Sequence, residues 1–143
     1  MLDWFRKMFD SLKNCQPQTY AAMRIVAGFL FLWHGAQKLL GFPLPTPEGA
    51  PSFILYIAGP IELIGGALIM VGLFTRPVAF LASGLMAFAY FLGHVFRPVE
   101  DPGVWHYLLP LVNRGEAAVL FCFVFLYIAA RGNGMCSLGG DED

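Results

Sequence analysis

The sequence predicts an all-α fold: an integral membrane four-helix bundle preceded by an amphipathic N-terminal helix. Hydrophobic residues make up 57% of its 143 residues and charged residues only 13%, whereas ordinary soluble domains have about 45–50% and about 25%. A soluble chain of this size could not cover its surface with so few charges. Four apolar segments are each close to the ~20 residues that cross a hydrocarbon core, and stretches rich in proline or glycine interrupt them.

Residues 1–19 are the predicted amphipathic helix. Its apolar side chains recur at helical spacing: Leu2, Phe5, Met8 or Phe9, and Leu12. Basic residues lie on the other faces of the helix wheel. This pattern is typical of a helix that lies on a membrane surface. The alternative is a short helix that caps the bundle.

Four membrane-spanning helices follow within a single domain that covers residues 1–143. We expect the spans at about residues 20–40, 53–73, 77–96 and 114–130. Between the last two, the segment "WHYLLPLVNRGE" predicts a short interfacial or re-entrant element. Glycines in the second and third spans predict close approach between helices: Gly65, Gly66, Gly72, Gly84 and Gly93.

The distribution of basic residues predicts the orientation. Four spans place both termini on one side of the membrane. That side then carries most of the lysine and arginine: Arg6, Lys7, Lys13, Arg24, Arg76 and Arg131. Because basic residues concentrate on the cytoplasmic side, we predict cytoplasmic N- and C-termini. Arg24 and Arg76, near the inner boundary, are predicted to anchor this topology.

Glu62 carries the sharpest signal because it lies in the middle of the second span. A charged carboxylate at the centre of a membrane helix costs about 2.5–3.5 kcal/mol on insertion scales. It is tolerated only if it is protonated, paired, or facing a wet cavity. We predict that Glu62 handles protons or a ligand. The alternative is a carboxyl group hydrogen-bonded between helices to hold the bundle together.

His34 and Lys38 are four residues apart and share one face of the first span. His34 suits a proton acceptor, with a hydrogen bond across helices as the alternative. Lys38 suits a charge-balancing group, with snorkelling of its ammonium to the lipid head groups as the alternative. His94 lies near the end of the third span and is either a site residue or an ordinary interfacial residue.

The segment "NRGE", residues 113–116, precedes the fourth span. Asn113 can cap the helix, and Glu116 lies in its first turn, where the helix dipole favours an anion. Arg114 opposes that dipole, so it suits a counter-ion to Glu62 or an anion-binding group.

In the predicted orientation these polar residues share the outer half of the bundle. The predicted site combines two candidate catalytic residues, Glu62 and His34, with the candidate substrate-binding or charge-balancing residues Lys38, His94, Asn113, Arg114 and Glu116.

Other kinds of site are not predicted. Cys15, Cys122 and Cys136 are far apart and form neither a CxxC motif nor a metal-ligand spacing, and the histidines and acidic residues give no compact metal-binding set. The net charge is −1, and no basic face is present, so no nucleic-acid partner is predicted.

The ordered set of motifs resembles the DoxX family of small four-helix membrane proteins. The resemblance rests on Arg24 with "HGAQKLLGF" (34–42), on "GPIELIGGALIMVGLFTR" (59–76), on "PLVNRGEAAVL" (110–120) and on the closing "GNGMCSLGG". It implies a location in the bacterial cytoplasmic (inner) membrane. It also implies a relationship to membrane oxidoreductase subunits, among them subunits of thiosulfate:quinone oxidoreductase.

The leading hypothesis is a redox-associated membrane subunit that receives a small substrate or a quinone in an outward-facing cavity. Glu62 and His34 would move protons, while Lys38 and Arg114 would balance the charge of an anion. No electron carrier is seen in the sequence, so catalysis would need partner subunits or a bound cofactor. The alternatives are a transporter or channel for an anion or small solute, acting as a homo-oligomer, and a non-catalytic membrane scaffold for soluble enzymes.

Overall fold

The computed structural model describes residues 1–46, 48–49 and 51–140. These residues form helices and loops and contain no strand, so the all-α prediction is confirmed. The elements in chain order are α1 (Leu2–Asn14), α2 (Gln16–Leu40), the π-helical turn η1 (Ile54–Ala58), α3 (Gly59–Val71), α4 (Thr75–Tyr90), the π-helical turn η2 (Phe91–Val95), α5 (Val104–Leu108), α6 (Pro110–Asn113) and α7 (Glu116–Arg131).

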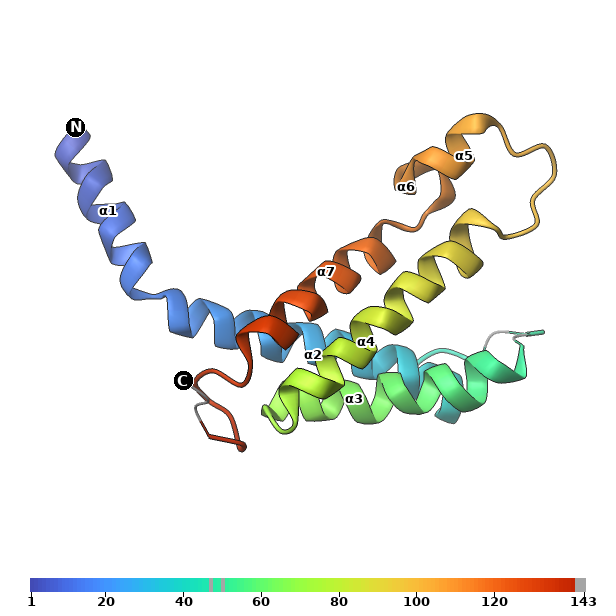
Figure 1. The fold of residues 1–143 in the computed structure, drawn as a ribbon, viewed down its shortest axis with the longest axis horizontal. Coiled ribbons are helices and arrows are strands. Elements are labelled where there is room, and N and C mark those ends of the chain that lie inside the picture. The colour runs from blue at the N-terminus through green and yellow to red at the C-terminus, as the bar shows by residue number, and fades with distance from the viewer. Residues whose placement is uncertain (47, 50, 141–143) are drawn as a thin grey trace.

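The four long helices are arranged as two pairs. α2 packs along α3, and α4 packs along α7. Figure 1 shows that the two pairs lie together near the α3–α4 turn and diverge toward the loop that follows η2. We call the end with the α3–α4 turn and the C-terminal segment 132–140 the closed end, and the opposite end the open end.

Glycines bring the backbones of α2 and α3 into direct contact. A Cβ atom on Gly28 would lie 2.6 Å from the carbonyl oxygen of Gly66, and a Cβ atom on Gly35 would lie 2.2 Å from the backbone nitrogen of Leu63. Any side chain at these positions would push the helices apart. The α2–α3 pair is therefore fixed along most of its length, and the close approach predicted for Gly66 is confirmed.

A core of aromatic and small residues joins the two pairs. The buried rings of Phe31 on α2 and Phe125 on α7 have centroids 4.7 Å apart. On α4, Ala79 has no exposed surface. The hydroxyl group of Ser83 donates a 2.8 Å hydrogen bond to the backbone carbonyl of Cys122 on α7. Small side chains on α4 thus allow α7 to approach closely.

Two stretches of the described chain are long and apolar enough to cross a membrane, residues 54–71 and 75–95. They correspond to the second and third predicted spans and support the membrane character of the protein. α2 has 25 residues but carries Arg24, His34 and Lys38. α7 has only 16 residues, or roughly 24 Å of helix. By length and composition, two of the four predicted spans are therefore supported, the second and the third.

Several local expectations are corrected. The second span begins with η1, directly before the Gly59–Pro60 start of α3, because Pro60 has no N–H group to continue a regular α-helical ladder. α7 begins at Glu116 rather than at Arg114, whose left-handed backbone, with φ of 60°, ends α6. The predicted close approach is wrong for Gly84 and Gly93, because no atom lies within 4 Å of a Cβ built on either residue.

α1 lies apart from the bundle and buries none of its residues. In Figure 1 it projects away beyond the start of α2. Its exposed apolar side chains are Leu2, Trp4, Phe5, Phe9 and Leu12. This placement does not fit a helix that caps the bundle, and a helix on a membrane surface stays the prediction.

Candidate functional site

Arg24 organises the closed end. Its side chain is completely buried. One guanidinium nitrogen donates hydrogen bonds to the carbonyl oxygens of Ile69 and Met70 at 2.6 and 2.8 Å, and the other donates to Met135 and Cys136 at 3.2 and 2.8 Å. The first two carbonyls belong to the last turn of α3, where the helix leaves its acceptors unsatisfied. Arg24 therefore ties α2 to the end of α3 and to the C-terminal segment.

Arg76 and Tyr20 complete the closed end. Arg76, at the start of α4, donates a 2.7 Å hydrogen bond to the carbonyl oxygen of Ala130 near the end of α7. A cation at this position also complements the negative end of the helix dipole. The hydroxyl group of Tyr20 donates to the carbonyl oxygen of Gly132, which joins α2 to the chain just after α7.

These contacts add a structural role to the two arginines that are predicted to be topology anchors. Arg24 is buried among backbone carbonyls. Arg76 is more exposed, but its guanidinium group also binds carbonyls at a helix end. Both residues are helix-capping groups within the fold. The sequence could not reveal this role, since the acceptors are backbone atoms far away along the chain.

At the open end, Lys38 and Glu62 form an ion pair between α2 and α3. The Glu62 side chain is only 4% exposed and the Lys38 side chain 18% exposed. The close α2–α3 contact at Gly35 brings the two side chains within reach. The partner of the intramembrane carboxylate is thus a cation of the protein. Arg114, the other candidate counter-ion, makes no ion pair within the described residues.

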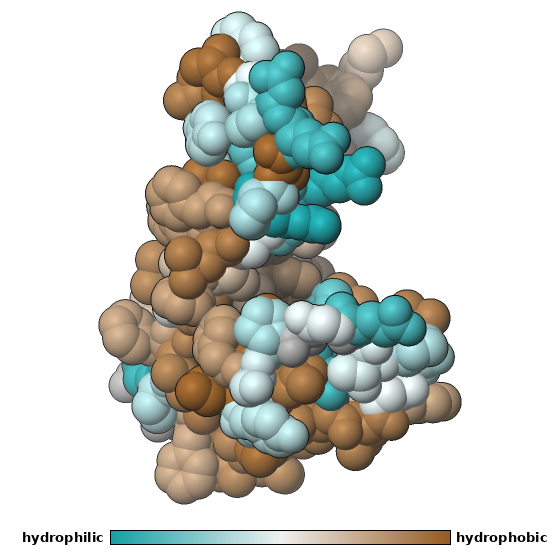
Figure 2. All heavy atoms as spheres, turned by 90° about the vertical axis from the view of Figure 1, so that its right-hand side faces the viewer, coloured by the Kyte–Doolittle hydropathy of each residue, from teal (hydrophilic) through white to brown (hydrophobic). Residues whose placement is uncertain are grey.

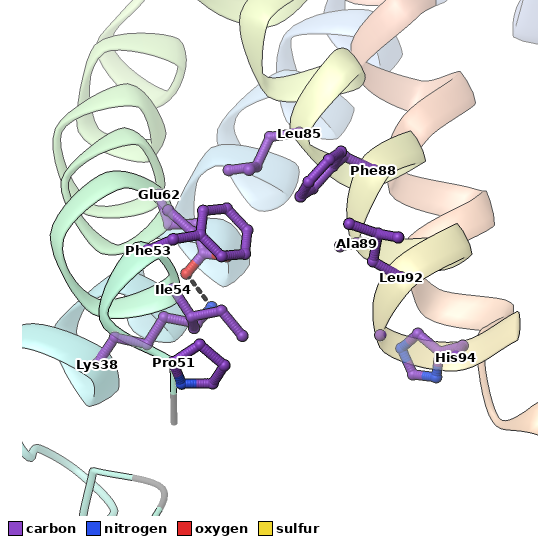
Figure 3. A pocket seen from close by; sticks show the side chains of 12 residues that line it. Lys38, Pro51, Phe53, Ile54, Glu62, Leu85, Phe88, Ala89, Leu92 and His94 are labelled. Carbon is purple, nitrogen blue, oxygen red and sulfur yellow. Dashed lines mark hydrogen bonds and ion pairs between the residues drawn. The ribbon is translucent and has the colours of Figure 1, made fainter. Parts of the chain in front are cut away.

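The Lys38–Glu62 pair borders a cleft of about 360 Å³ between the two helix pairs. Figure 3 shows the pair on one wall, with His94 across the opening and apolar side chains between them. The apolar lining includes Phe53, Leu85, Phe88 and Ala89. Figure 2, which faces the open end, shows a hollow between two lobes with hydrophilic residues on both rims.

A second cavity of about 280 Å³, here called the side chamber, adjoins the cleft. The two share Lys38, Glu62, Ala89 and His94. The side chamber is also lined by the predicted residues His34 and Arg114 and by the core residue Phe31. Five predicted site residues therefore line one connected space: His34, Lys38, Glu62, His94 and Arg114.

One ring nitrogen of His94 is held by a hydrogen bond. Its Nδ1 atom lies 3.1 Å from the backbone carbonyl oxygen of Asn113. A carbonyl oxygen only accepts, so Nδ1 donates the hydrogen in this bond. The bond also ties η2 to the α6–α7 junction.

Asn113 and Glu116 do not line the cleft or the side chamber. Asn113 is buried; its side chain donates to the carbonyl of His106 at 3.0 Å and accepts from the backbone N–H of Gly115 at 2.9 Å. It braces the break between α6 and α7, and Gly115 rather than Asn113 is the N-cap residue of α7. Glu116 faces a shallow groove on the outer surface, between α6 and α7.

The connected space has a formal excess of positive charge. Lys38 and Arg114 contribute two cations against the single carboxylate of Glu62, if both histidines are neutral. The rest of the lining is mostly apolar. Such a space can hold a flat or elongated apolar molecule and offer hydrogen-bond donors to its oxygen atoms.

Among the described residues, no group of three His, Cys, Asp or Glu side chains is placed to hold a metal ion.

The sequence analysis missed the aromatic wall of the cleft. Phe53 and Phe88 pack edge to face with ring centroids 5.3 Å apart, across the gap between the two helix pairs. In the sequence they look like ordinary lipid-facing residues of two apolar spans. Only their meeting next to Lys38 and Glu62 marks them as part of a site.

Fold and site together define a class: a small all-helical membrane protein with a buried acid–base pair beside an apolar cleft. The chain belongs to the DoxX family, whose family model, described as DoxX, matches residues 20–95.

Two curated relatives are similar over much of their length. A Haemophilus influenzae protein described as "Uncharacterized protein" is 38% identical over 132 residues, which is 90% of this chain and 94% of that protein. A Bacillus subtilis protein named "Putative oxidoreductase CatD" is 33% identical over 95 residues, 64% of this chain and 71% of that protein. No solved structure matches the chain.

Proposed function

We propose that this protein is a multi-pass membrane subunit of an oxidoreductase assembly, and that its open-end cleft binds the head group of a quinone. The observation that carries this proposal is the mostly apolar cleft bordered by the Lys38–Glu62 pair on one side and by His94 on the other. A quinone ring needs apolar walls, and its two carbonyl oxygens need hydrogen-bond donors. The name of the Bacillus subtilis relative supports an oxidoreductase association.

The proposal divides the chemistry between this chain and its partners. Reduction of a quinone to a quinol consumes two electrons and two protons. Lys38, Glu62, His34 and His94 are groups that can relay protons to the quinone oxygens. Arg114 adds a cation that stabilises negative charge on them. The electrons would come from another oxidoreductase subunit or from a bound cofactor.

The proposal also includes four membrane crossings by α2, η1–α3, α4–η2 and α6–α7 within one domain, with both termini cytoplasmic in the bacterial inner membrane. Length and apolar composition support the middle two crossings. The outer two are packed alongside them. The basic residues of α1 and of the closed end support the orientation.

Quinone content is the direct test of the function. The protein is purified in a mild detergent, and bound quinone is extracted and quantified against protein for the wild type, Glu62→Gln and Glu116→Gln. We expect bound quinone in the wild type and a loss of about tenfold in Glu62→Gln, since the displaced Lys38 ammonium no longer has its anchoring carboxylate. Glu116→Gln is the matched control, because that carboxylate faces away from the cleft.

Equal quinone content in all three proteins, or none in the wild type, contradicts the proposal. Flux of a small anion into liposomes in the absence of bound quinone would instead favour a transporter. Soluble enzymes that co-purify without quinone would favour a scaffold.

Thiol labelling tests the orientation. Cys15 lies at the α1–α2 junction and is exposed. In a Cys136→Ser background, a membrane-impermeant maleimide should label Cys15 only after the inner membrane is opened. A cysteine introduced at Glu100, in the loop at the open end, should be labelled in intact spheroplasts. The reverse pattern would place the termini outside.

A further inference from the structure

The lipid-facing side of the bundle carries an apolar furrow between α3 and α4. The furrow exists because α3 packs mainly on α2 and α4 mainly on α7, so the two consecutive helices leave a gap between them. Its first section has a volume of about 400 Å³ and is lined by Phe53, Ile61, Phe80, Leu81, Gly84, Leu85 and Phe88. A second section of about 260 Å³ continues along Ile61, Ile64, Leu68, Val78 and Leu81 toward the closed end.

The furrow shares part of its wall with the cleft. Phe53, Leu85 and Phe88 line both the cleft and the first section of the furrow. Ile61 and Leu81 line both sections of the furrow. The Phe53–Phe88 pair, with ring centroids 5.3 Å apart, separates the two spaces. A molecule whose head lies beside Lys38 would reach the furrow when these two side chains move apart.

Gly84 keeps the first section of the furrow open. It lies in the interior of α4, where glycine weakens a helix relative to other residues, yet a Cβ atom at this position would meet nothing within 4 Å. No close packing between helices accounts for the glycine, unlike Gly28 or Gly35. The absence of a side chain leaves space in the furrow wall.

We propose that the furrow binds the apolar tail of the ligand whose polar head occupies the cleft, and that Phe53 and Phe88 form the lateral portal between the two. The inference rests on the proposed function and narrows its ligand to an amphipathic molecule with one polar head and a long, slender tail. Such a ligand enters from the bilayer through the side of the bundle. The apolar lining of the furrow and the polar groups of the cleft match the two halves of this molecule.

The test compares two quinones on the purified full-length protein: ubiquinone-0, which has no tail, and decylubiquinone, which has a ten-carbon tail. The variant is Gly84→Leu, which places a side chain in the furrow. Leucine is a good helix former, and the site is free of neighbours, so the variant should fold. Ala130→Leu, on the exposed face of α7 away from the furrow, is the matched control.

We expect decylubiquinone to bind the wild type and Ala130→Leu more tightly than ubiquinone-0 does. In Gly84→Leu this advantage should fall by about tenfold, the factor that corresponds to about two methylene groups displaced from apolar contact. Ubiquinone-0 should bind all three proteins equally, because the substitution does not touch the cleft. If Gly84→Leu keeps the full preference for decylubiquinone over ubiquinone-0, the furrow does not bind the tail, and the proposed function still stands. Failure of both quinones to bind the wild type overturns both proposals.

A photoreactive decylubiquinone with a diazirine at the end of its tail distinguishes a ligand tail from a lipid acyl chain. Cross-links should map to Ile61, Phe80 or Leu81, and an excess of ubiquinone-0 should suppress them by displacing the head from the cleft. Cross-links that persist under this competition would show that the furrow takes up apolar chains independently of the cleft, and would overturn the proposal.

Discussion

The two ends of the bundle are built differently. At the closed end, Arg24 donates to four backbone carbonyls, and Tyr20 links the α2–α3 pair to the chain after α7. The backbone N–H groups of Leu138 and Gly139 also bond to the carbonyls of Val71 and Gly72, at 2.9 and 3.0 Å. These two bonds attach the segment 132–140 to the end of α3.

At the open end the hydrogen bonds stay within each helix pair. The Lys38–Glu62 ion pair joins α2 to α3, and the His94–Asn113 bond joins η2 to the α6–α7 junction. Among the described residues, no side-chain hydrogen bond at this end crosses from one pair to the other. Lys38, Glu62 and His94 therefore do not join the two helix pairs to each other but line the cleft between them. The side-chain hydrogen bonds that link the two helix pairs are therefore at the closed end, and the polar residues of the open end line the cleft.

The largest expected effect tests the role of Arg24 at the closed end. Arg24→Met would leave four carbonyls without their donor in a buried site, so we expect a loss of about 3–5 kcal/mol in the free energy of unfolding, similar to breaking a buried charged network. Arg24→Lys should lose less, since it keeps the charge but cannot reach all four acceptors. Denaturation in mixed micelles measures both. Near-wild-type stability of Arg24→Met would show that the closed end does not depend on this clamp.

The next effect compares two glycines. Gly35→Ala should destabilise the protein by about 1–3 kcal/mol, because its Cβ would overlap the α3 backbone and force the helices apart. Gly84→Ala should be neutral or stabilising by up to about 1 kcal/mol, because it adds helix propensity without a clash. The same denaturation measurement applies. Equal effects at the two positions would contradict the close α2–α3 packing.

An effect of similar size is expected from the ion pair at the open end. Lys38→Met leaves the buried Glu62 carboxylate without its cation, and we expect a loss of about 1–3 kcal/mol. Adding Glu62→Gln should recover most of this stability, because the unpaired charge is removed, but should not restore quinone binding. A double-mutant cycle of stability and bound quinone separates the two roles. If the double variant regains quinone, the pair is structural only.

The smallest effects compare single neutral hydrogen bonds at the two ends. Tyr20→Phe removes the hydroxyl donor to Gly132 and should cost about 1 kcal/mol, since the acceptor is buried. Gln37→Met removes an exposed 3.2 Å bond to the Pro45 carbonyl and should change stability by less than about 0.5 kcal/mol. Thermal unfolding in one detergent compares the two variants. A larger loss for Gln37→Met would reverse the assignment of stability to the closed end.

Much of the candidate site could be predicted from the sequence. His34, Lys38, Glu62, His94 and Arg114 line one connected space, and a polar residue in an apolar span is visible without a structure because of its cost in lipid. The location of Glu116 was not predictable in this way. A charge in the first turn of a helix is satisfied by the dipole wherever it points, so the sequence does not say which face it lies on.

The roles of the arginines and aromatics could not be predicted. Arg24 was predicted to anchor the topology, and its hydrogen bonds to carbonyls of α3 and of the C-terminal segment could not be anticipated. Phe53 and Phe88 carry no polar signal that distinguishes them from other apolar residues of their spans. Backbone carbonyls and apolar rings are present throughout any helical sequence, so their use at one place depends on which helices meet there.

Composition and residue pattern are enough to predict that this chain is all-helical and apolar enough for a membrane, and which side chains are costly enough in lipid to need a partner. These properties follow from the composition, the length of the apolar segments and the transfer cost of each residue, all of which are local. The packing of the helices in three dimensions is needed to see that Glu62 pairs with Lys38, that Arg24 closes one end, and that the helix pairs diverge around a cleft. These features depend on which helices approach each other: glycines bring α2 and α3 into contact, and α3 and α4 leave a gap between them.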